Sequence, residues 1–266
     1  MKVDSLYLEI TRNCTIECEH CLRGDKEQKN MTPETLENIL KNIREIKTLL
    51  LSGGEPLLAI TILESLPKLI EKYHIKIETI GIISNGTVCS NRHIEALEKI
   101  KESCSNFKFF LSSDLFHRLE WKRLGLEEKV SKNFEKYHQI FQMEKFLEND
   151  RFHNITLNLK GRAEHLTPER IQKITENQYI NYDFAEVPVE GNIEIEQESI
   201  YGKVCIDVNG NIVDYSASYE EEDIQSEKGF NTNQIPLKNA VKLYISDIKS
   251  RRKVYQKNNN IRNRMY

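Results

Sequence analysis

Strand-like and helix-like segments alternate through the first 190 residues of the chain. Residues 6–11 alternate apolar and polar side chains, as a half-buried strand does, and the apolar side chains at 36–46 follow helical spacing. Further strands are predicted at 48–51, 77–83, 107–111, 155–159 and 182–189, and further helices at 57–73, 91–101, 118–149 and 168–177. About six strand–helix units imply a parallel sheet with helices packed around it. We therefore expect an α/β fold, a partial (β/α)6 barrel, with its chemistry at the carboxyl ends of the strands.

The pattern changes after residue 190, where we expect a second, smaller unit. Two strand-like segments at 204–208 and 212–215 flank Asn209-Gly210, which is a strong hairpin signal. A helix is predicted from 236 to about 256, followed by a basic end. We interpret the acidic run at 190–227 and the basic run over the last sixteen residues as a solvated face and a frayed tail. The expected division is a barrel core over residues 1–190 and a small α+β cap over residues 191–266.

Composition and charge exclude several classes of protein. The 266 residues are 39% hydrophobic and 30% charged, which suits a globular chain and excludes a collagen-like or fully disordered one. No apolar run approaches the length of a spanning helix, about 18 residues, and the first residues contain no apolar signal core. A net charge of -3 argues against a general nucleic-acid binder. We expect a cytoplasmic protein without a membrane partner and without a strong nucleic-acid signal.

Three of the six cysteines lie close together. Cys14, Cys18 and Cys21 follow the first predicted strand, whereas the others are scattered at 89, 104 and 205. Clustered cysteines in a chain without a signal peptide point to metal binding or redox chemistry. Sulfur ligands suit zinc, which needs a fourth ligand, or a four-iron cluster, in which three ligands leave one iron open. His20 is a candidate fourth ligand, but its adjacency to Cys21 makes joint ligation awkward.

The cysteine motif at 14–21 and the Gly-Gly-Glu-Pro sequence at 53–56 resemble the radical S-adenosylmethionine (radical SAM) superfamily. The similarity covers roughly residues 5–190. It implies that Cys14, Cys18 and Cys21 hold a single [4Fe–4S] cluster, whose open iron chelates S-adenosylmethionine. It also implies that one electron cleaves this cofactor to a 5′-deoxyadenosyl radical, which abstracts hydrogen from the substrate.

The resemblance implies cofactor contacts at the ends of the next strands. Gly53 and Gly54 let the backbone approach a ligand closely, and Glu55 is expected near the methionyl amino group. Ser84 and Asn85 are candidates for the ribose hydroxyls, although Asn-Gly is also a common turn.

Two further segments offer polar side chains to the same cofactor. Ser112 and Asp114 are candidates for its ribose or carboxylate, and Asp114 is equally a helix cap. Arg162 is a candidate for its carboxylate or for an anionic substrate group, with a surface salt bridge as the alternative. His117 is expected on a helix surface.

The C-terminal third resembles the start of a SPASM or twitch extension. The resemblance rests on residues 202–205 and the hairpin that follows, but no cysteine comes after Cys205. An auxiliary cluster is therefore not expected, and we interpret the region as a degenerate cap. A carbon radical needs an enclosed pocket, so residues 200–256 are predicted to fold over the open end of the sheet.

The expected function is hydrogen abstraction from a peptide or a small polar substrate. His20 before the third cysteine recurs in peptide-modifying relatives and favours a precursor peptide, and the expected electron donor is a flavodoxin or ferredoxin. The alternatives are an enzyme resembling 7-carboxy-7-deazaguanine synthase, a glycyl-radical activase, and a non-catalytic, metal-stabilised binding module.

Overall fold

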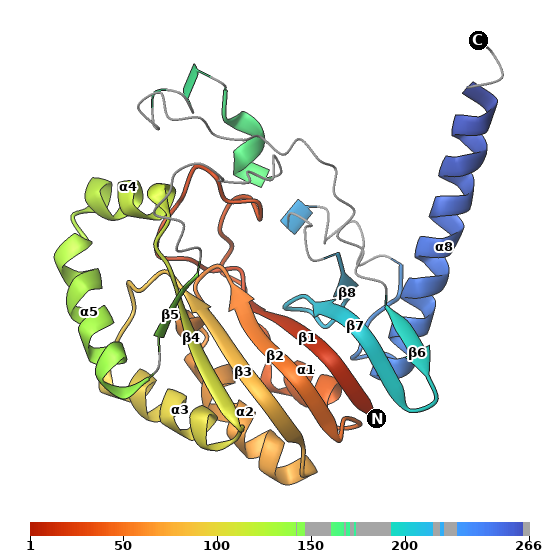
Figure 1. The fold of residues 1–266 in the computed structure, drawn as a ribbon, viewed down its shortest axis with the longest axis horizontal. Helices are drawn as coiled ribbons and strands as arrows, with labels where there is room; N and C mark the ends of the chain where they lie inside the picture. The colour runs from red at the N-terminus through yellow and green to blue at the C-terminus, as the bar shows by residue number, and fades with distance from the viewer. Residues whose placement is uncertain are drawn as a thin grey trace.

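The computed structural model describes residues 1–141, 143–146, 161–167, 169–170, 173, 193–214, 219–220 and 228–262. A single sheet organises this part of the chain, with the strand order β5-β4-β3-β2-β1-β7-β6 and with β8 paired to β7 (Figure 1). The first five strands are parallel, and they are β1 (Lys2–Thr11), β2 (Glu45–Gly53), β3 (Lys76–Ser84), β4 (Asn106–Ser112) and β5 (Met143–Phe146).

Amphipathic helices connect these parallel strands. The crossovers contain α1 (Pro33–Leu40), the short 3₁₀ turn η1 (Pro56–Leu58), α2 (Ile60–Tyr73) and α3 (Asn91–Glu102). The N-terminus of α1 is capped by the Thr32 side chain, which accepts a hydrogen bond from the Thr35 N–H. Leu36, Leu49 and Leu63 are fully buried between the helices and the sheet. The strands therefore run in one direction, and their carboxyl ends meet at one edge of the sheet.

The region after β4 differs from the predicted long helix over 118–149. It contains two helices, α4 (Leu115–Leu124) and α5 (Glu127–Ile140), and then strand β5. Gly125 adopts a left-handed conformation with φ of 65°, which ends α4. The strands predicted at 155–159 and 182–189 lie outside the described residues, as does most of the helix predicted at 168–177. The α/β class and the parallel sheet of a partial barrel are confirmed.

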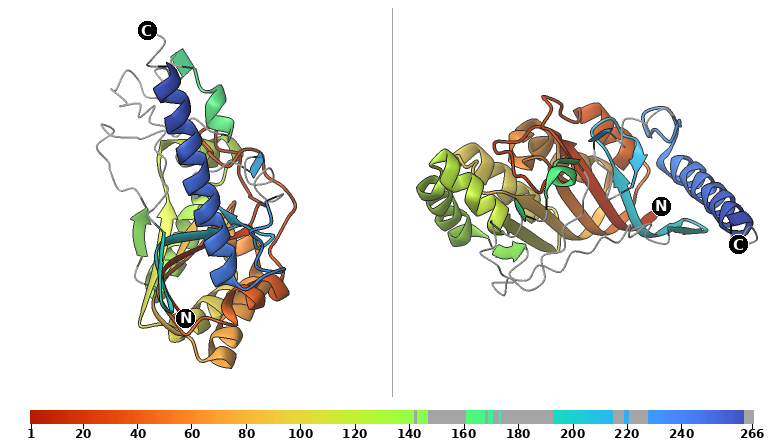
Figure 2. Two further views of the ribbon diagram at one scale, coloured as in Figure 1. Left: turned by 90° about the vertical axis from the view of Figure 1, so that its right-hand side faces the viewer. Right: turned by 90° about the horizontal axis from the view of Figure 1, so that it is seen from above.

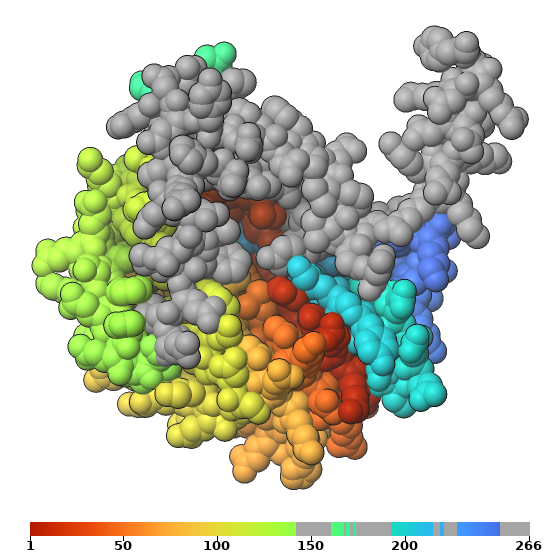
Figure 3. Space-filling view, in the orientation of Figure 1, coloured from red at the N-terminus to blue at the C-terminus, as the bar shows by residue number. Residues whose placement is uncertain are grey.

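The C-terminal region contributes strands to the same sheet. These are β6 (Glu194–Glu196), β7 (Ser199–Ile206) and β8 (Ile212–Val213). β7 lies parallel to β1, with Leu6 opposite Val204, and the space-filling view shows this cyan segment directly beside red β1 (Figure 3). The predicted hairpin is present as β7 and β8, with Gly210 in the turn at φ of 86°. β7 is thus a strand of the sheet and not part of a cap over it, because its backbone pairs with the open edge of β1 and its apolar side chains join the core.

Helix α8 (Leu237–Arg262) packs by its first turns against the core. Leu237, Ala240 and Val241 are fully buried, and Tyr244 lies edge-on to the Phe230 ring. The helix then extends beyond the end of the sheet (Figure 2). Among the described helices, none has the length and hydropathy of a membrane span.

Candidate functional site

A cavity of about 230 Å³ lies at the carboxyl ends of β1–β4. Most of the side chains and glycines predicted for cofactor binding line it, namely Cys14, Cys18, Cys21, Gly53, Gly54, Asn85, Ser112 and Arg162. Glu55, Ser84 and Asp114 are not among the lining residues. The sheet therefore brings together segments that are up to about 150 residues apart, as expected at the carboxyl edge of parallel strands.

The three cysteines lie on the loop that joins β1 to α1. Two backbone hydrogen bonds fold the loop back on itself, from Cys21 N–H to Cys18 O at 3.1 Å and from Gly24 N–H to Cys21 O at 3.3 Å. Ile16 and Cys18 are buried in a small apolar cluster with Phe116 and Trp121 of α4. This cluster fixes the loop against α4, and all three cysteines line one cavity.

The surroundings of the thiols are largely apolar. Burial raises the pKa of Cys14 to about 11 and raises that of Cys18 well above the ordinary thiol value. Asn85 donates a hydrogen bond from Nδ2 to Cys14 Sγ over 3.5 Å. Thiols in such a place become thiolates when a metal supplies the compensating positive charge.

Glu55 is fully buried beneath the cavity. Its carboxylate accepts hydrogen bonds from the Leu57 N–H at 3.1 Å, the Asn85 N–H at 2.8 Å and Ser84 Oγ at 2.9 Å. Burial raises the pKa of Glu55 to about 7. The hydrogen bonds of Glu55 with Ser84 and with the Asn85 N–H join the end of β2 to the end of β3. They also hold Asn85 in the cavity wall. Ligand contacts by these two side chains remain predictions.

Gly53 and Gly54 bring two loops of the chain close together. A Cβ atom at Gly54 would lie 2.4 Å from Asn13 O and 3.0 Å from Cys14 Cβ, and one at Gly53 would lie 2.2 Å from Thr11 O. Gly53 also has φ of 147°. The backbone before the first cysteine approaches closely here, since only glycine leaves room for it. The contact of Gly53 and Gly54 with the cofactor remains a prediction.

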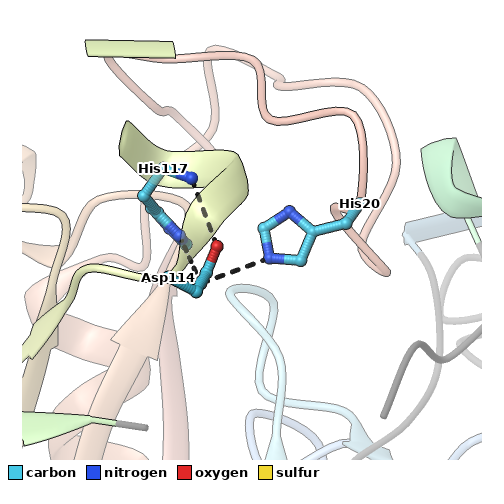
Figure 4. A group of neighbouring side chains, drawn as sticks. All are labelled: His20, Asp114 and His117. Carbon is cyan, nitrogen blue, oxygen red and sulfur yellow. Dashed lines mark hydrogen bonds and ion pairs between the residues drawn. The ribbon is translucent and has the colours of Figure 1, made fainter. Parts of the chain in front are cut away.

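Asp114 connects the end of β4 to the cysteine loop (Figure 4). Its Oδ1 caps α4 by accepting from the N–H groups of Phe116 at 2.9 Å and His117 at 3.2 Å. Its Oδ2 lies 2.6 Å from His117 Nδ1 and 3.5 Å from His20 Nε2, and the His20 ring stacks on Phe116. Burial by itself would raise the pKa of Asp114, but His117 and His20 together hold it well below its usual range.

The predicted capping role of Asp114 is present in the structure, and its cofactor contact remains a prediction. His117 lines the cavity, so its expected place on a helix surface is wrong. One carboxylate oxygen and two imidazole nitrogens of this group lie within 4.8 Å of one another, and such ligands also suit zinc. The spacing from 114 to 117 is visible in the sequence, whereas the approach of His20 depends on the tertiary fold.

Arg162 also holds the cysteine loop in place. It lies in the short 3₁₀ helix η2 (Gly161–His165), and its Nε donates to Cys18 O at 3.0 Å. Its backbone N–H donates to Cys21 O at 3.0 Å, and its Nη1 lies 3.5 Å from exposed Asp25. The predicted salt bridge exists, but the stronger contacts are to the loop carbonyls.

Several lining residues were not predicted from the sequence, among them Arg12, Arg23, Lys26 and Tyr219. Arg12 is completely buried, donates to Glu9 and Glu27, and lies 4.7 Å from the centre of the Tyr219 ring. An arginine directly after a predicted strand is the only local signal for this site, because Tyr219 comes from a distant segment.

The donor set fits an iron–sulfur cluster better than a closed zinc site. Three thiols share the cavity, and no fourth cysteine lines it among the residues that the structure describes. Cys205 is buried on β7, and Cys104 contacts main-chain carbonyls after α3. Three soft ligands with room beside them suit a cluster with one open iron.

Comparisons with known proteins agree with this donor set. Residues 8–141 match the family model described as "Radical SAM superfamily". A protein named "Probable GTP 3′,8-cyclase" from Methanocaldococcus jannaschii is 30% identical over 110 residues, which cover 40% of this chain and 35% of that protein. A protein of the same name from Methanothermobacter marburgensis is 30% identical over 143 residues, covering 47% of this chain and 44% of that protein. The chain thus matches less than half the length of these relatives.

Solved structures with a similar chain path have low sequence identity to this chain. "Native anSMEcpe with bound AdoMet" has a TM-score of 0.46 at 20% identity, over 68% of this chain and 51% of that one. Streptococcus suis SuiB bound to the precursor peptide SuiA has a TM-score of 0.42 at 18% identity, over 79% of this chain and 58% of that one.

Proposed function

This chain belongs to the radical SAM superfamily, and from that premise we propose that it cleaves S-adenosylmethionine reductively at a single [4Fe–4S] cluster to take hydrogen from a peptide or a small polar substrate. The observation that carries the proposal is the gathering of Cys14, Cys18 and Cys21 in one cavity at the carboxyl ends of the parallel strands. When bound there, the cluster and S-adenosylmethionine supply the electron and the carbon radical.

The residues of the chain would hold and orient these groups. The three cysteines are the proposed cluster ligands, and Asn85 donates a hydrogen bond to the sulfur of the first one. A hydrogen bond to a ligating thiolate stabilises added negative charge, so it raises the reduction potential. The proposed contacts to S-adenosylmethionine come from the segments at 53–55, 84–85 and 112–114 and from Arg162, as the family resemblance implies.

The cysteine loop also limits the access of water. Ile16 and Cys18 are buried against Phe116 and Trp121, and the His20 ring covers Phe116. A dry wall on this side protects a reactive carbon radical from side reactions. Tyr219, from the proposed C-terminal cap, adds an aromatic ring to the same cavity.

The class of substrate has two candidates. His20, directly before the third cysteine of the motif, supports a peptide as the substrate. The proposed partner is then a precursor peptide. The two relatives named "Probable GTP 3′,8-cyclase" favour a nucleotide within the class of small polar substrates. A flavodoxin or ferredoxin remains the proposed electron donor.

The experiment is anaerobic reconstitution followed by iron analysis and reaction with S-adenosylmethionine and dithionite. We expect about four irons per chain and slow release of 5′-deoxyadenosine without substrate. Replacing Cys14, Cys18 or Cys21 with Ala should remove both properties, whereas Cys89→Ala, as a matched control, should keep both. About eight irons per chain would overturn the single cluster, and intact iron binding in Cys18→Ala would overturn the assignment of ligands.

A further inference from the structure

Helix α4 packs directly on the cysteine loop. Its buried side chains Phe116 and Trp121 form one apolar cluster with Ile16 and Cys18 of the loop, and Figure 1 shows α4 beside the red loop that follows β1. An α-helix with its side chains is about 10–12 Å across. The outer face of α4 is therefore separated from the proposed cluster ligands by little more than the helix itself.

The outer face of α4 carries cations. Four exposed side chains recur on it at helical spacing, and they are Arg118, Leu119, Lys122 and Arg123. The one carboxylate of the helix, on Glu120, is buried and accepts from the Glu17 N–H of the cysteine loop at 3.4 Å. Arg123 pairs with Glu120, but its side chain is still 58% exposed. The face is thus positive on a chain whose net charge is -3.

The same helix exposes apolar side chains. Among the described residues, four large hydrophobic side chains are exposed, and two of them lie on α4. Leu119, on the outer face, is 39% exposed, and Leu124, the last residue of the helix, is 40% exposed. Apolar side chains beside charges of one sign suit a weak protein–protein contact, in which charge steers the partner and a small apolar area holds it.

The exposed part of the cysteine loop is less suited to a charged partner. Glu17 and Glu19 lie between the cysteines and are exposed. Glu17 pairs with Lys26 at 2.9 Å, and Glu19 pairs with Arg170. The charges of these pairs cancel, and the cavity side of the loop is the proposed place of S-adenosylmethionine and the substrate. A partner that recognises charge is therefore directed to α4.

We propose that the outer face of α4 docks a small acidic redox protein, of the flavodoxin or ferredoxin class, which reduces the cluster. The acidic surface of such a donor is attracted to Arg118, Lys122 and Arg123. Electron transfer slows steeply with distance, so the short path across α4 favours this approach. The donor loses one electron and the cluster gains it, and no bond forms or breaks. This inference rests on the proposed function, because it places the electron donor of the same site.

The first test measures binding of the reconstituted protein to an oxidised flavodoxin and to an oxidised ferredoxin by titration calorimetry. At least one of them should bind saturably, and more weakly as salt is added. Lys122→Glu places a like charge opposite the acidic partner and should weaken binding by about tenfold at low salt. Leu119→Ala removes apolar contact area, so its effect should be similar at low and high salt. Lys68→Glu, the same charge change at an exposed position of α2, should leave the affinity unchanged.

The second test measures the rate of cluster reduction by the reduced donor and, separately, by dithionite. Lys122→Glu should slow reduction by a subsaturating donor by about tenfold, because fewer encounters lead to docking. Reduction by dithionite, which needs no docking surface, should be unchanged. Iron content is measured for each variant. If Lys122→Glu loses iron, Lys122→Gln only removes the charge and should show a smaller loss of donor binding.

Two results would overturn the inference. One is the absence of saturable binding of both donors. The other is equal behaviour of Lys122→Glu and Lys68→Glu, because it would mean that α4 is not the docking surface. Release of 5′-deoxyadenosine with dithionite is measured in parallel. Release without binding of either donor would refute the docking surface alone, whereas no release with dithionite would refute the proposed function.

Discussion

Polar side chains at the strand ends of this protein bind one another. Glu55 and Ser84 join the ends of β2 and β3, and Asn85 is oriented by the backbone bond from its N–H to Glu55. Asn85 then reaches Cys14 through its side-chain amide. A buried carboxylate thus positions a residue that contacts a proposed cluster ligand, which is a common way to orient the groups around a metal.

The buried carboxyl of Glu55 should make stability depend on pH. Its pKa is about 7 in the folded protein and 4.5 ordinarily, so the folded state binds the proton more tightly. The resulting stabilisation is fully present below pH 4.5 and is lost as pH rises through 7. A difference of this size corresponds to about 3 kcal/mol. Relative to wild type, Glu55→Gln should therefore gain unfolding free energy between pH 4.5 and 8, as measured by urea unfolding. A difference between the two proteins that does not change with pH would contradict this prediction.

The helix-capping role of Asp114 can be tested separately from the role of its charge. Asp114→Ala removes the acceptor for two N–H groups of α4 and should lower the free energy of unfolding by about 1 kcal/mol. Asp114→Asn retains a good cap but loses the charge that faces His117 and His20, so its stability should lie below that of wild type and above that of the Ala variant. If the predicted cofactor contact also exists, both variants bind S-adenosylmethionine more weakly. Equal stability of the Ala and Asn variants would contradict the capping role.

Among the elements, two short segments hold the cysteine loop in addition to α4. The end of β2 supports it from one side, where Gly54 touches the backbone of Asn13. On the other side, η2 binds the carbonyls of Cys18 and Cys21 through Arg162. Contacts to main-chain atoms fix the path of the loop independently of its side chains, so the cysteines remain available to a cluster.

The contact between η2 and the loop can be tested at Gly161. A Cβ there would lie 2.4 Å from Gly24 N and 2.5 Å from Leu22 O, and φ is 57°. Gly161→Ala should displace η2 and speed the loss of iron to a chelator. Gly125→Ala is a matched control, because Gly125 has φ of 65° but no atom within 4 Å of the added Cβ. That control should cost about 1 kcal/mol of stability without faster iron loss. Equal iron loss in both variants would mean that the contact is unimportant.

At the scale of the whole molecule, the C-terminal region is joined to the barrel through the sheet. Ile200, Val204 and Ile206 of β7 belong to the same hydrophobic core as β1, and the first turns of α8 complete it. This arrangement buries the edge of β1, which would otherwise be exposed at the side of the sheet. Residues 1–190 and the later strands are thus packed as one body in the described part of the chain.

A chain ending at residue 195 should therefore fail to fold. It lacks β7 and α8, so the apolar edge of β1 and the side chains beneath α8 would be exposed to water. We expect aggregation, or loss of the cooperative unfolding transition, as measured by circular dichroism together with iron content. A point variant, Val204→Ala, should remain folded and lose about 1 to 3 kcal/mol. A soluble, folded chain 1–195 that retains its iron would show that this region is dispensable for the sheet.

Several features of the fold follow from local patterns in the sequence. The alternating apolar residues of β1 and the helical spacing in α1 predict these elements because each pattern repeats within a few residues. The division into α4 and α5 is not predicted, since the helical pattern continues on both sides of Gly125. The cap at Asp114 was predicted as one of two alternatives, because capping depends on the next three residues only.

The sequence by itself determined the parallel α/β class and the three clustered cysteines, since both are encoded over short stretches of chain. Only the tertiary structure decided that β7 pairs with β1, that His20 meets Asp114, and that Arg12 lies between Asp207 and Tyr219. The physical reason is the same in each case. These partners are roughly 90 to 200 residues apart, and no local periodicity specifies which distant segment occupies the open edge of a strand or the far wall of a cavity.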